Sequence, residues 1–205
     1  MKGFYQQFIT DKSFLILKQL KKDFDFVLIG GWAVYFYTKS LKSKDIDIIV
    51  DFSQLENLKK NFPIEKNERL KKYQVKLEEI DIDIYLPFYS RLGLPVEEII
   101  KETILINGFT LPKKEVLLIT KINAYQSRKE SVKGQKDLID ILSLVLMEDF
   151  EFDYFLNLVK KYRLEDYRLT LEKIIKETNE VKDLSLNRHF WGRKKGRLLE
   201  KIKSF

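Results

Sequence analysis

The chain of 205 residues is 44% hydrophobic and 34% charged, a composition that supports a buried core and excludes a disordered polymer. It has no cysteine, which excludes disulfide scaffolds and thiolate zinc sites, and its one histidine, His189, argues against a multi-histidine metal site or a Ser-His-Asp hydrolase. The formal net charge of +7 favours an anionic partner.

The first half of the chain has the pattern of a mixed α/β domain. In chain order we expect a helix over 11–22, a buried strand over 26–29, a helix over 32–39, an acidic strand over 45–50, a polar helix or loop over 54–61, a strand over 73–77 and a second acidic strand over 80–86. Asn107-Gly108, between the apolar runs 103–106 and 109–111, predicts a β-hairpin.

Every long segment of the remaining chain has helical periodicity. Its apolar stripes predict helices that include residues 117–122, 138–145, 154–162 and 169–176. We therefore expect an α+β fold in two domains. A mixed sheet flanked by helices would occupy residues 1–112, and a helical bundle would follow over residues 113–205.

The sequence shows no export or membrane signal. Residues 1–10 lack the long apolar run of a signal peptide. The uncharged stretch 26–38 is shorter than the roughly 18 apolar residues that a membrane-spanning helix needs. Together with the absence of cysteine, this predicts a cytoplasmic protein without a membrane partner.

The two acidic strands carry the most informative chemistry. Residues i and i+2 of a strand lie on one face, about 6.5 to 7 Å apart, so Asp45 and Asp47 share a face. Ile46 and the isoleucine after Asp47 would then point into the core. Two carboxylates on one face repel each other, and a divalent cation with hard oxygen ligands, magnesium above all, relieves that repulsion. A third carboxylate, from Asp81 or Asp83, would complete a two-metal site for phosphoryl or nucleotidyl transfer.

Gly30 and Gly31 end the first predicted strand and precede a helix. Glycine lets the backbone approach a ligand closely, and the N-terminus of the following helix favours phosphate. A Gly-Gly pair by itself is more often only a turn, and an acidic strand by itself can be a solvent-facing edge strand. The order of strand, Gly-Gly, helix and acidic strand favours a phosphate-binding turn beside a metal site.

Two segments resemble the signature of the nucleotidyltransferase superfamily, which has the DNA polymerase beta-like fold. They are Leu28-Ile29-Gly30-Gly31 and Ser43-Lys44-Asp45-Ile46-Asp47-Ile48, separated by a gap at the long end of the family's range. The resemblance implies a nucleotidyltransferase core in which Asp45, Asp47 and a third acid on a later strand hold two magnesium ions. We assign the third role to Asp83, whose face Asp81 shares.

The segment Lys42-Ser43-Lys44 stands where relatives often carry Arg-x-Thr-x before the acids. The resemblance therefore implies that a serine or lysine of this segment contacts a phosphate group, and we assign this role to Ser43. A solvated loop is the alternative, and it is the favoured interpretation for Lys42.

A second run of motifs is similar to the AbiEii-like toxin nucleotidyltransferases and extends the resemblance over residues 26–142. It comprises Leu111-Pro112, Lys121-Ile122-Asn123-Ala124, Arg128, Lys136-Asp137 and Asp140. It implies that Lys121 and Asp137 belong to the active site and that Arg128 helps to hold a nucleoside triphosphate (NTP). Lys121 lies in an apolar helical stripe, where a buried ammonium needs an anion: the triphosphate, Asp137 or Asp140. The alternative is a structural Lys–Asp pair that joins two helices.

The C-terminal segment 182–205 has eight basic and two acidic residues, which places +6 of the net charge there. Cations neutralise a polynucleotide backbone and aromatic rings stack on bases, so tRNA or another RNA is a possible partner. The expected contacts are Arg188, Trp191, Arg193, Lys194 and Lys195, with His189 as a tail contact. The alternative is a C-terminal helix whose apolar side chains pack while its charges meet water, those side chains being Phe190, Trp191, Leu198, Leu199 and Ile202.

These features predict a magnesium-dependent nucleotidyltransferase that transfers a nucleoside monophosphate from an NTP to an acceptor hydroxyl. Resemblance to the toxin branch favours the 3′ end of tRNA as the acceptor and a cognate antitoxin as a partner. A small molecule or a protein hydroxyl is an alternative acceptor. A second hypothesis is a non-catalytic RNA-binding or toxin-neutralising protein on the same scaffold.

Overall fold

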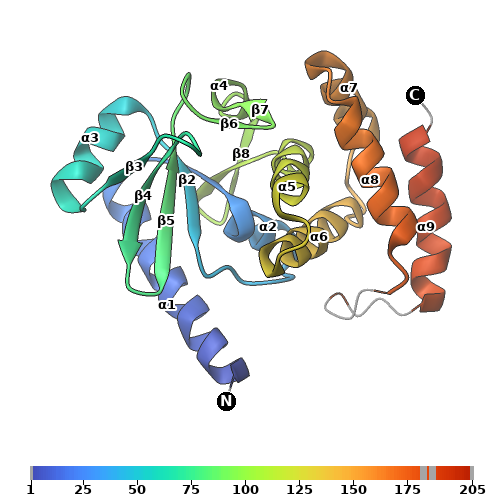
Figure 1. Ribbon diagram of the computed structural model, residues 1–205, viewed down its shortest axis with the longest axis horizontal. Coiled ribbons are helices and arrows are strands. Elements are labelled where there is room, and N and C mark those ends of the chain that lie inside the picture. The colour runs from blue at the N-terminus through green and yellow to red at the C-terminus, as the bar shows by residue number, and fades with distance from the viewer. Residues whose placement is uncertain (1, 181–183, 185–187, 204–205) are drawn as a thin grey trace. The chain divides into compact units, whose positions relative to one another are not determined.

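The computed structural model describes residues 2–180, 184 and 188–203, and all their side chains except those of 2–5 and 188–190. The chain divides into two compact units, Met1–Lys113 (unit 1) and Lys114–Phe205 (unit 2) (Figure 1). Unit 1 combines a mixed sheet with helices and unit 2 is helical in its described part. The predicted α+β class is therefore confirmed.

Within the described residues, the main sheet of unit 1 has seven strands in the order β3-β4-β5-β2-β1-β9-β8. They are β1 (Val27–Ile29), β2 (Ile46–Ile49), β3 (Glu65–Asn67), β4 (Lys72–Leu77), β5 (Ile80–Tyr85), β8 (Thr103–Ile106) and β9 (Phe109–Pro112). The central strand β2 runs antiparallel to β1 and parallel to β5, and β4 runs antiparallel to β5. A separate two-stranded sheet consists of β6 (Arg91–Leu92) and β7 (Leu94–Pro95).

Four helices accompany the sheet in the described part of unit 1: α1 (Lys2–Asp23), α2 (Gly30–Thr38), α3 (Phe52–Asn61) and α4 (Val96–Ile99). In Figure 1, α1 passes behind β4 and β5. The buried indole Nε1 of Trp32 in α2 donates a hydrogen bond to Ser13 Oγ in α1 over 2.9 Å. The ring of Phe14 lies 5.2 Å from that of Trp32, so aromatic packing joins the same two helices.

The isoleucines of the acidic strands form the centre of the core. Ile46 and Ile48 in β2, and Ile82 and Ile84 in β5, are at most 1% exposed. Because side chains alternate along a strand, the aspartates between them lie on the opposite face of the sheet. The alternation predicted from the sequence is confirmed on both strands.

The structure decides three local features of unit 1 that the sequence analysis predicted: a helix or loop around 54–61, a hairpin at 107–108 and the start of the first helix. The polar stretch around 54–61 is a helix, because the Asp51 side chain caps it by accepting a hydrogen bond from the Gln54 backbone over 2.7 Å. The expected hairpin is present, with Asn107 and Gly108 both at positive φ between β8 and β9. The first helix begins earlier than expected, at Lys2.

Unit 2 contains, in its described part, α5 (Lys114–Arg128), α6 (Val132–Val145), α7 (Phe152–Tyr162), α8 (Glu165–Glu177) and α9 (Arg188–Lys203). Helix α5 contacts α6, α7 and α8, and α9 contacts α7 and α8. A hydrogen bond of 2.8 Å from Tyr167 Oη to Asn123 Oδ1 joins α8 to α5. These contacts make unit 2 a bundle organised around α5.

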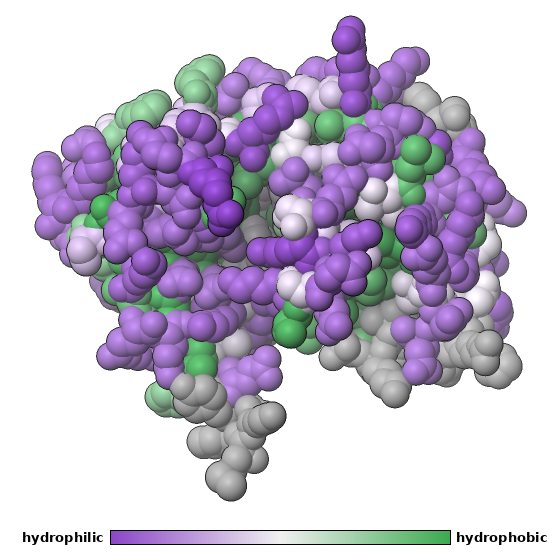
Figure 2. Space-filling model, in the orientation of Figure 1, coloured by the Kyte–Doolittle hydropathy of each residue, from purple (hydrophilic) through white to green (hydrophobic). Residues whose placement is uncertain are grey.

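The described helices include none that is both long enough and apolar enough to cross a membrane. The face drawn in Figure 2 is largely hydrophilic, with hydrophobic side chains dispersed among the polar ones.

Candidate functional site

The aspartates of unit 1 lie on adjacent strands of one sheet. The register of the parallel pair β2–β5 places Asp47 directly opposite Asp83, and neighbouring strands are about 4.8 Å apart. Asp45 is half-buried and comes immediately before β2, two residues from Asp47. Asp81 lies on the same face of β5 as Asp83, and its cross-strand partner on β4 is Lys76. The fold therefore brings Asp47 and Asp83 side by side on the face away from the core.

Gly30 determines the position of Asp47. It begins α2 with φ of +68°, and a Cβ atom built on it would lie 2.0 Å from Asp47 Oδ2. The carboxylate of Asp47 therefore lies directly against the first turn of α2. A helix N-terminus stabilises a nearby negative charge. The absence of a side chain at Gly30 therefore makes room for the Asp47 carboxylate. The sequence analysis expected a contact between this turn and phosphate, and it did not predict this second role.

The residues around this turn differ in their surroundings. Gly31 is buried within α2, and Ser43 is only 5% exposed in the segment before β2. Lys42 is exposed and its Nζ lies 2.6 Å from Asp11 Oδ1, a hydrogen bond that raises the pKa of Lys42. Lys42 thus fits the solvated interpretation, whereas Ser43 is a buried hydroxyl close to the acidic strand.

Asp83 has two partners that the sequence analysis missed. Lys72 Nζ lies 2.5 Å from Asp83 Oδ2, and Gln74 Nε2 donates to Asp83 Oδ1 over 2.7 Å. Both partners belong to β4, which forms a hairpin with β5. The signal was present in the sequence, because only two residues separate the strand predicted over 73–77 from the acidic strand, a spacing typical of a hairpin.

The carboxylates of this face fit a magnesium ion in part. Asp45 and Asp47 carry hard carboxylate oxygens, and Asp47 lies beside a turn in which a side chain at position 30 would clash with it. Both oxygens of Asp83 already accept hydrogen bonds. Among the residues that the structure describes, no group of three or more carboxylate, histidine or cysteine side chains is arranged to hold a metal ion. A role for Asp45, Asp47 and Asp83 as magnesium ligands therefore stays a prediction.

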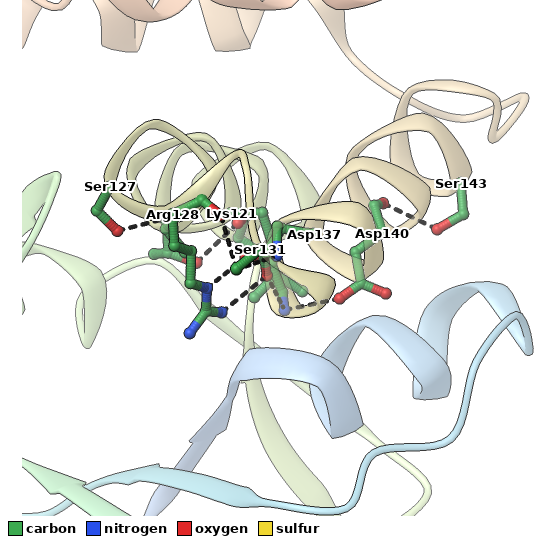
Figure 3. A network of polar contacts seen from close by, with 11 residues as sticks. Lys121, Ser127, Arg128, Ser131, Asp137, Asp140 and Ser143 are labelled. Atoms are coloured by element: carbon green, nitrogen blue, oxygen red, sulfur yellow. Dashed lines mark hydrogen bonds and ion pairs between the residues drawn. The ribbon is translucent and has the colours of Figure 1, made fainter. Parts of the chain in front are cut away.

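A second polar cluster lies in unit 2, between α5 and α6 (Figure 3). Lys121 Nζ lies 2.7 Å from Asp140 Oδ2 and 3.5 Å from Asp137 Oδ1. The guanidinium of Arg128 binds Asp137 through two hydrogen bonds of 2.7 and 3.0 Å. Two cations from α5 and two carboxylates from α6 thus form one network, in which Asp137 is shared.

The connection between α5 and α6 sets the geometry of this network. Ser131 caps α6 by accepting from the Gly134 backbone N–H over 3.0 Å, and its hydroxyl donates to the Arg128 carbonyl over 2.7 Å. A Cβ atom on Gly134 would lie 2.3 Å from that same carbonyl oxygen. Close backbone approach at Gly134 therefore places Asp137, one turn later, within reach of Arg128.

Asp140 is the most deeply buried acid of the network. Its side chain has no exposed area, and its Oδ1 is buried without a hydrogen-bond partner. Burial raises the pKa of Asp140, and Lys121 opposes that rise. Lys121 and Arg128 thus have carboxylate partners inside unit 2, as the structural Lys–Asp alternative expects, and their contact with a triphosphate stays a prediction.

The basic tail requires one correction. Trp191 is 1% exposed and its indole Nε1 donates to the Thr178 carbonyl over 2.7 Å, so it cannot stack on an RNA base. Leu198 and Ile202 are buried with it, which agrees with the packing alternative. The prediction failed because alternating aromatic and basic residues also suit an amphipathic helix on a bundle.

The remaining tail residues are divided between packing and solvent. Lys195 Nζ donates to the carbonyls of Lys176 and Thr178, at the C-terminal end of α8. Arg193 is exposed and Lys194 is half-buried. The side chains of Arg188 and His189 lie outside the described residues, as does that of Phe190.

The sequence matches no family model and no curated protein. Solved structures with which it shares 19% identity include an antigenic nucleotidyltransferase-like protein from Paracoccidioides brasiliensis, at a TM-score of 0.44 over 80% of this chain and 92% of that one. Another is JHP933 from Helicobacter pylori, also 19% identical, at a TM-score of 0.46 over 92% of this chain and 89% of that one. At this identity and these TM-scores, both the fold and the activity are argued from the chain's own residues.

Proposed function

We propose that the protein is a nucleotidyltransferase that transfers a nucleoside monophosphate from an NTP to an acceptor hydroxyl. The observation that carries the proposal is the position of the Asp47 carboxylate. It lies against Gly30 at the start of α2, and Asp47 is the cross-strand partner of Asp83. A purely structural strand has no need for two adjacent carboxylates on one face, because they repel each other. Lys72 offsets the charge of Asp83, and a cationic ligand at Asp47 would relieve the remaining repulsion.

In this proposal Asp45 and Asp47 would hold magnesium and, through it, the triphosphate. Magnesium bound there would neutralise phosphate charge and make the α-phosphorus more electrophilic. The Gly30-Gly31 turn and the buried hydroxyl of Ser43 line the phosphate side of the site. Asp83, oriented by Lys72 and Gln74, accepts the proton of the acceptor hydroxyl. The acceptor oxygen bonds to the α-phosphorus in line with the departing pyrophosphate, which leaves as the P–O bond breaks.

For the cluster of unit 2 we propose a structural role. Lys121, Arg128 and Asp137 satisfy one another's charge between α5 and α6, which agrees with an ion-paired link between two helices. The tRNA 3′ end as acceptor and a cognate antitoxin as partner are supported only by the resemblance of the motifs to AbiEii-like toxins.

The proposal is tested with the four α-labelled NTPs, magnesium and total RNA, followed by gel separation of labelled products. Wild type should transfer label, and Asp45→Asn and Asp47→Asn should lose the transfer. Asp25→Asn is the matched control, because the Asp25 side chain is 92% exposed and its variant removes the same charge. No transfer by wild type to RNA, protein or small-molecule acceptors, or equal transfer by all variants, would contradict the proposal.

The second candidate function, RNA binding without catalysis, is favoured by the basic character of α9. Arg193 and Arg197 are both exposed, so replacing both with glutamine should weaken binding to single-stranded RNA. Each lost phosphate contact should lower the salt dependence of log K by about 0.7. Filter binding over a range of salt concentrations measures this effect.

Trp191→Phe is the control for the tail experiment. The indole is buried, so this variant should leave the RNA affinity unchanged while it lowers the melting temperature. Unchanged affinity in the Arg193→Gln, Arg197→Gln double variant would remove these two arginines from any RNA-binding surface. RNA affinity that persists without magnesium, in a protein that transfers no label, would favour the non-catalytic function.

A further inference from the structure

We propose that the edge strand β8 pairs with the β8 strand of a second copy of the chain, so that the protein forms a two-fold dimer through one continuous sheet. The proposal concerns unit 1 alone and is independent of the proposed reaction. It follows from the difference between the two edge strands of the main sheet, β8 and β3. An unprotected edge strand presents a row of backbone donors and acceptors with which another strand can pair.

The outer backbone groups of β8 belong to Thr103 and Leu105. In an antiparallel pair, hydrogen-bonded residues alternate with residues whose backbone groups point away from the partner strand. The Glu102 carbonyl accepts a hydrogen bond from the Lys113 backbone over 2.8 Å, which fixes the alternation. It agrees with Pro112, the partner of Thr103 on β9, because proline has no N–H to donate. Thr103 and Leu105 therefore turn their N–H and C=O groups away from β9, toward the open edge.

Apolar side chains are exposed on both faces of this edge. Leu105 is 72% exposed and Ile104 is 40% exposed. Ile104 pairs with the buried Leu111 and so belongs to the core face, and Leu105, its neighbour, points to the opposite face. A docked helix or small ligand covers one face of a sheet, whereas an added strand covers the edge on both faces. The exposed side chains therefore indicate a strand as the partner.

The opposite edge strand, β3, is protected by charge. Glu65 forms an ion pair with Lys76 on β4. Lys66 forms another with Glu68, and all four side chains are exposed. Charged side chains on an edge strand prevent another strand from pairing there. A sheet that can grow only at β8 closes after two copies, which predicts a dimer rather than a fibre.

A second copy of β8 suits this edge because the strand is uncharged. The segment 103–106 contains only threonine, leucine and isoleucine. The charges that flank it have partners of opposite sign in the same chain. Lys101 Nζ lies 2.6 Å from Glu98 Oε1. Lys113 Nζ lies 2.8 Å from Glu102 Oε2. Two copies of the strand can therefore pair without placing like charges opposite each other.

Backbone geometry selects the register of the pair. The outward groups of Thr103 in one copy meet those of Leu105 in the other, so that each such pair exchanges both of its hydrogen bonds. This register places Ile104 on the two-fold axis. Registers centred on Leu105 or Thr103 would instead oppose the strand to the turns at Asn107 or Lys101.

The oligomeric state of the full chain tests the proposal. Sedimentation velocity over a range of protein concentrations should show an equilibrium between monomer and dimer. Leu105→Lys should raise the dimer dissociation constant about tenfold or more, because it places a charge in the paired edge. Leu70→Lys is the matched control. It adds the same charge at a 52% exposed side chain in the turn after β3, and it should leave the dissociation constant as in wild type.

Two further variants separate strand pairing from other effects of the added charge. Leu105→Pro removes a backbone N–H that β9 does not use, so it should abolish the dimer while the circular dichroism spectrum stays that of wild type. Ile104→Cys introduces a single thiol, because the sequence has no cysteine. Residues opposite each other on the axis have Cα atoms about 4.5 Å apart, so mild oxidation should join two chains by a disulfide. Leu70→Cys should stay unlinked under the same conditions.

Each outcome decides the proposal. A wild-type chain that stays monomeric at every concentration, or that assembles beyond two copies, would overturn it. A dimer that is unchanged in folded Leu105→Lys and Leu105→Pro would also overturn it, because another surface would then hold the two copies. If both substitutions unfold the chain, the yields of disulfide-linked dimer decide, and equal yields from Ile104→Cys and Leu70→Cys reject strand pairing.

Discussion

Gly30→Ala should lower the rate of label transfer about 100-fold while the protein remains folded. The added Cβ would lie 2.0 Å from Asp47 Oδ2, so the carboxylate must move by a distance on the order of 1 Å or more. A displacement of this size at a reacting centre costs roughly 100-fold in rate. Steady-state transfer assays at saturating NTP measure the change.

Gly108→Ala is the matched control for this prediction. Gly108 also has positive φ, of +80°, but a Cβ atom there would meet nothing within 4 Å. Both variants pay for a left-handed alanine, roughly 1 kcal/mol, and only Gly30→Ala also displaces an acid. Equal transfer rates in the two variants would show that the position of Asp47 is unimportant for the reaction.

Lys121→Met should lower the free energy of unfolding by about 3 to 5 kcal/mol at neutral pH. The substitution removes the ammonium 2.7 Å from Asp140 Oδ2 and leaves that fully buried carboxylate without this cation. Chemical denaturation monitored by circular dichroism measures the loss. Lys173→Met is the control, because it breaks an exposed pair with Glu177 in the same unit and should cost little.

The loss of stability in Lys121→Met should depend on pH in a defined direction. Burial already raises the pKa of Asp140 above its usual 3.8, and without Lys121 this pKa rises further. Between the unfolded and the folded pKa, the native state binds a proton that the unfolded chain has released, so stability falls as pH rises through the folded pKa. The difference from wild type should therefore be larger at pH 8 than at pH 5.

A different result would restore the functional alternative for Lys121. If Lys121→Met keeps the unfolding free energy of wild type but loses label transfer, the ammonium serves the reaction rather than the bundle. If stability and transfer both fall, the variant Lys121→Arg separates the structural role of the ammonium from a role in the reaction. A retained charge should restore stability, because Asp140 regains a cationic partner.

The local structure of the acidic strands could be predicted from the sequence. Alternation of isoleucine and aspartate is a property of neighbouring residues, and it determines which side chains enter the core of a sheet. Asn107-Gly108 likewise specifies its own turn, because both residues accept positive φ. The apolar stripes of α5 to α8 have the same local origin.

Contacts between distant segments required the tertiary structure. Strand register decided that Asp83, and not Asp81, lies opposite Asp47, because a parallel pair is aligned by a long connection that leaves no local signal. The β4–β5 hairpin placed the Lys72 ammonium on the Asp83 carboxylate. Close approach at Gly134 brought Arg128 to Asp137.

The sequence by itself therefore determined the elements of this protein and the faces on which its acids lie. Only the tertiary structure decided which charges neutralise one another and that Trp191 belongs to the core. The physical reason is the range of the interactions. Periodicity and turn chemistry act over a few residues, whereas burial and ion pairing depend on which strands and helices meet.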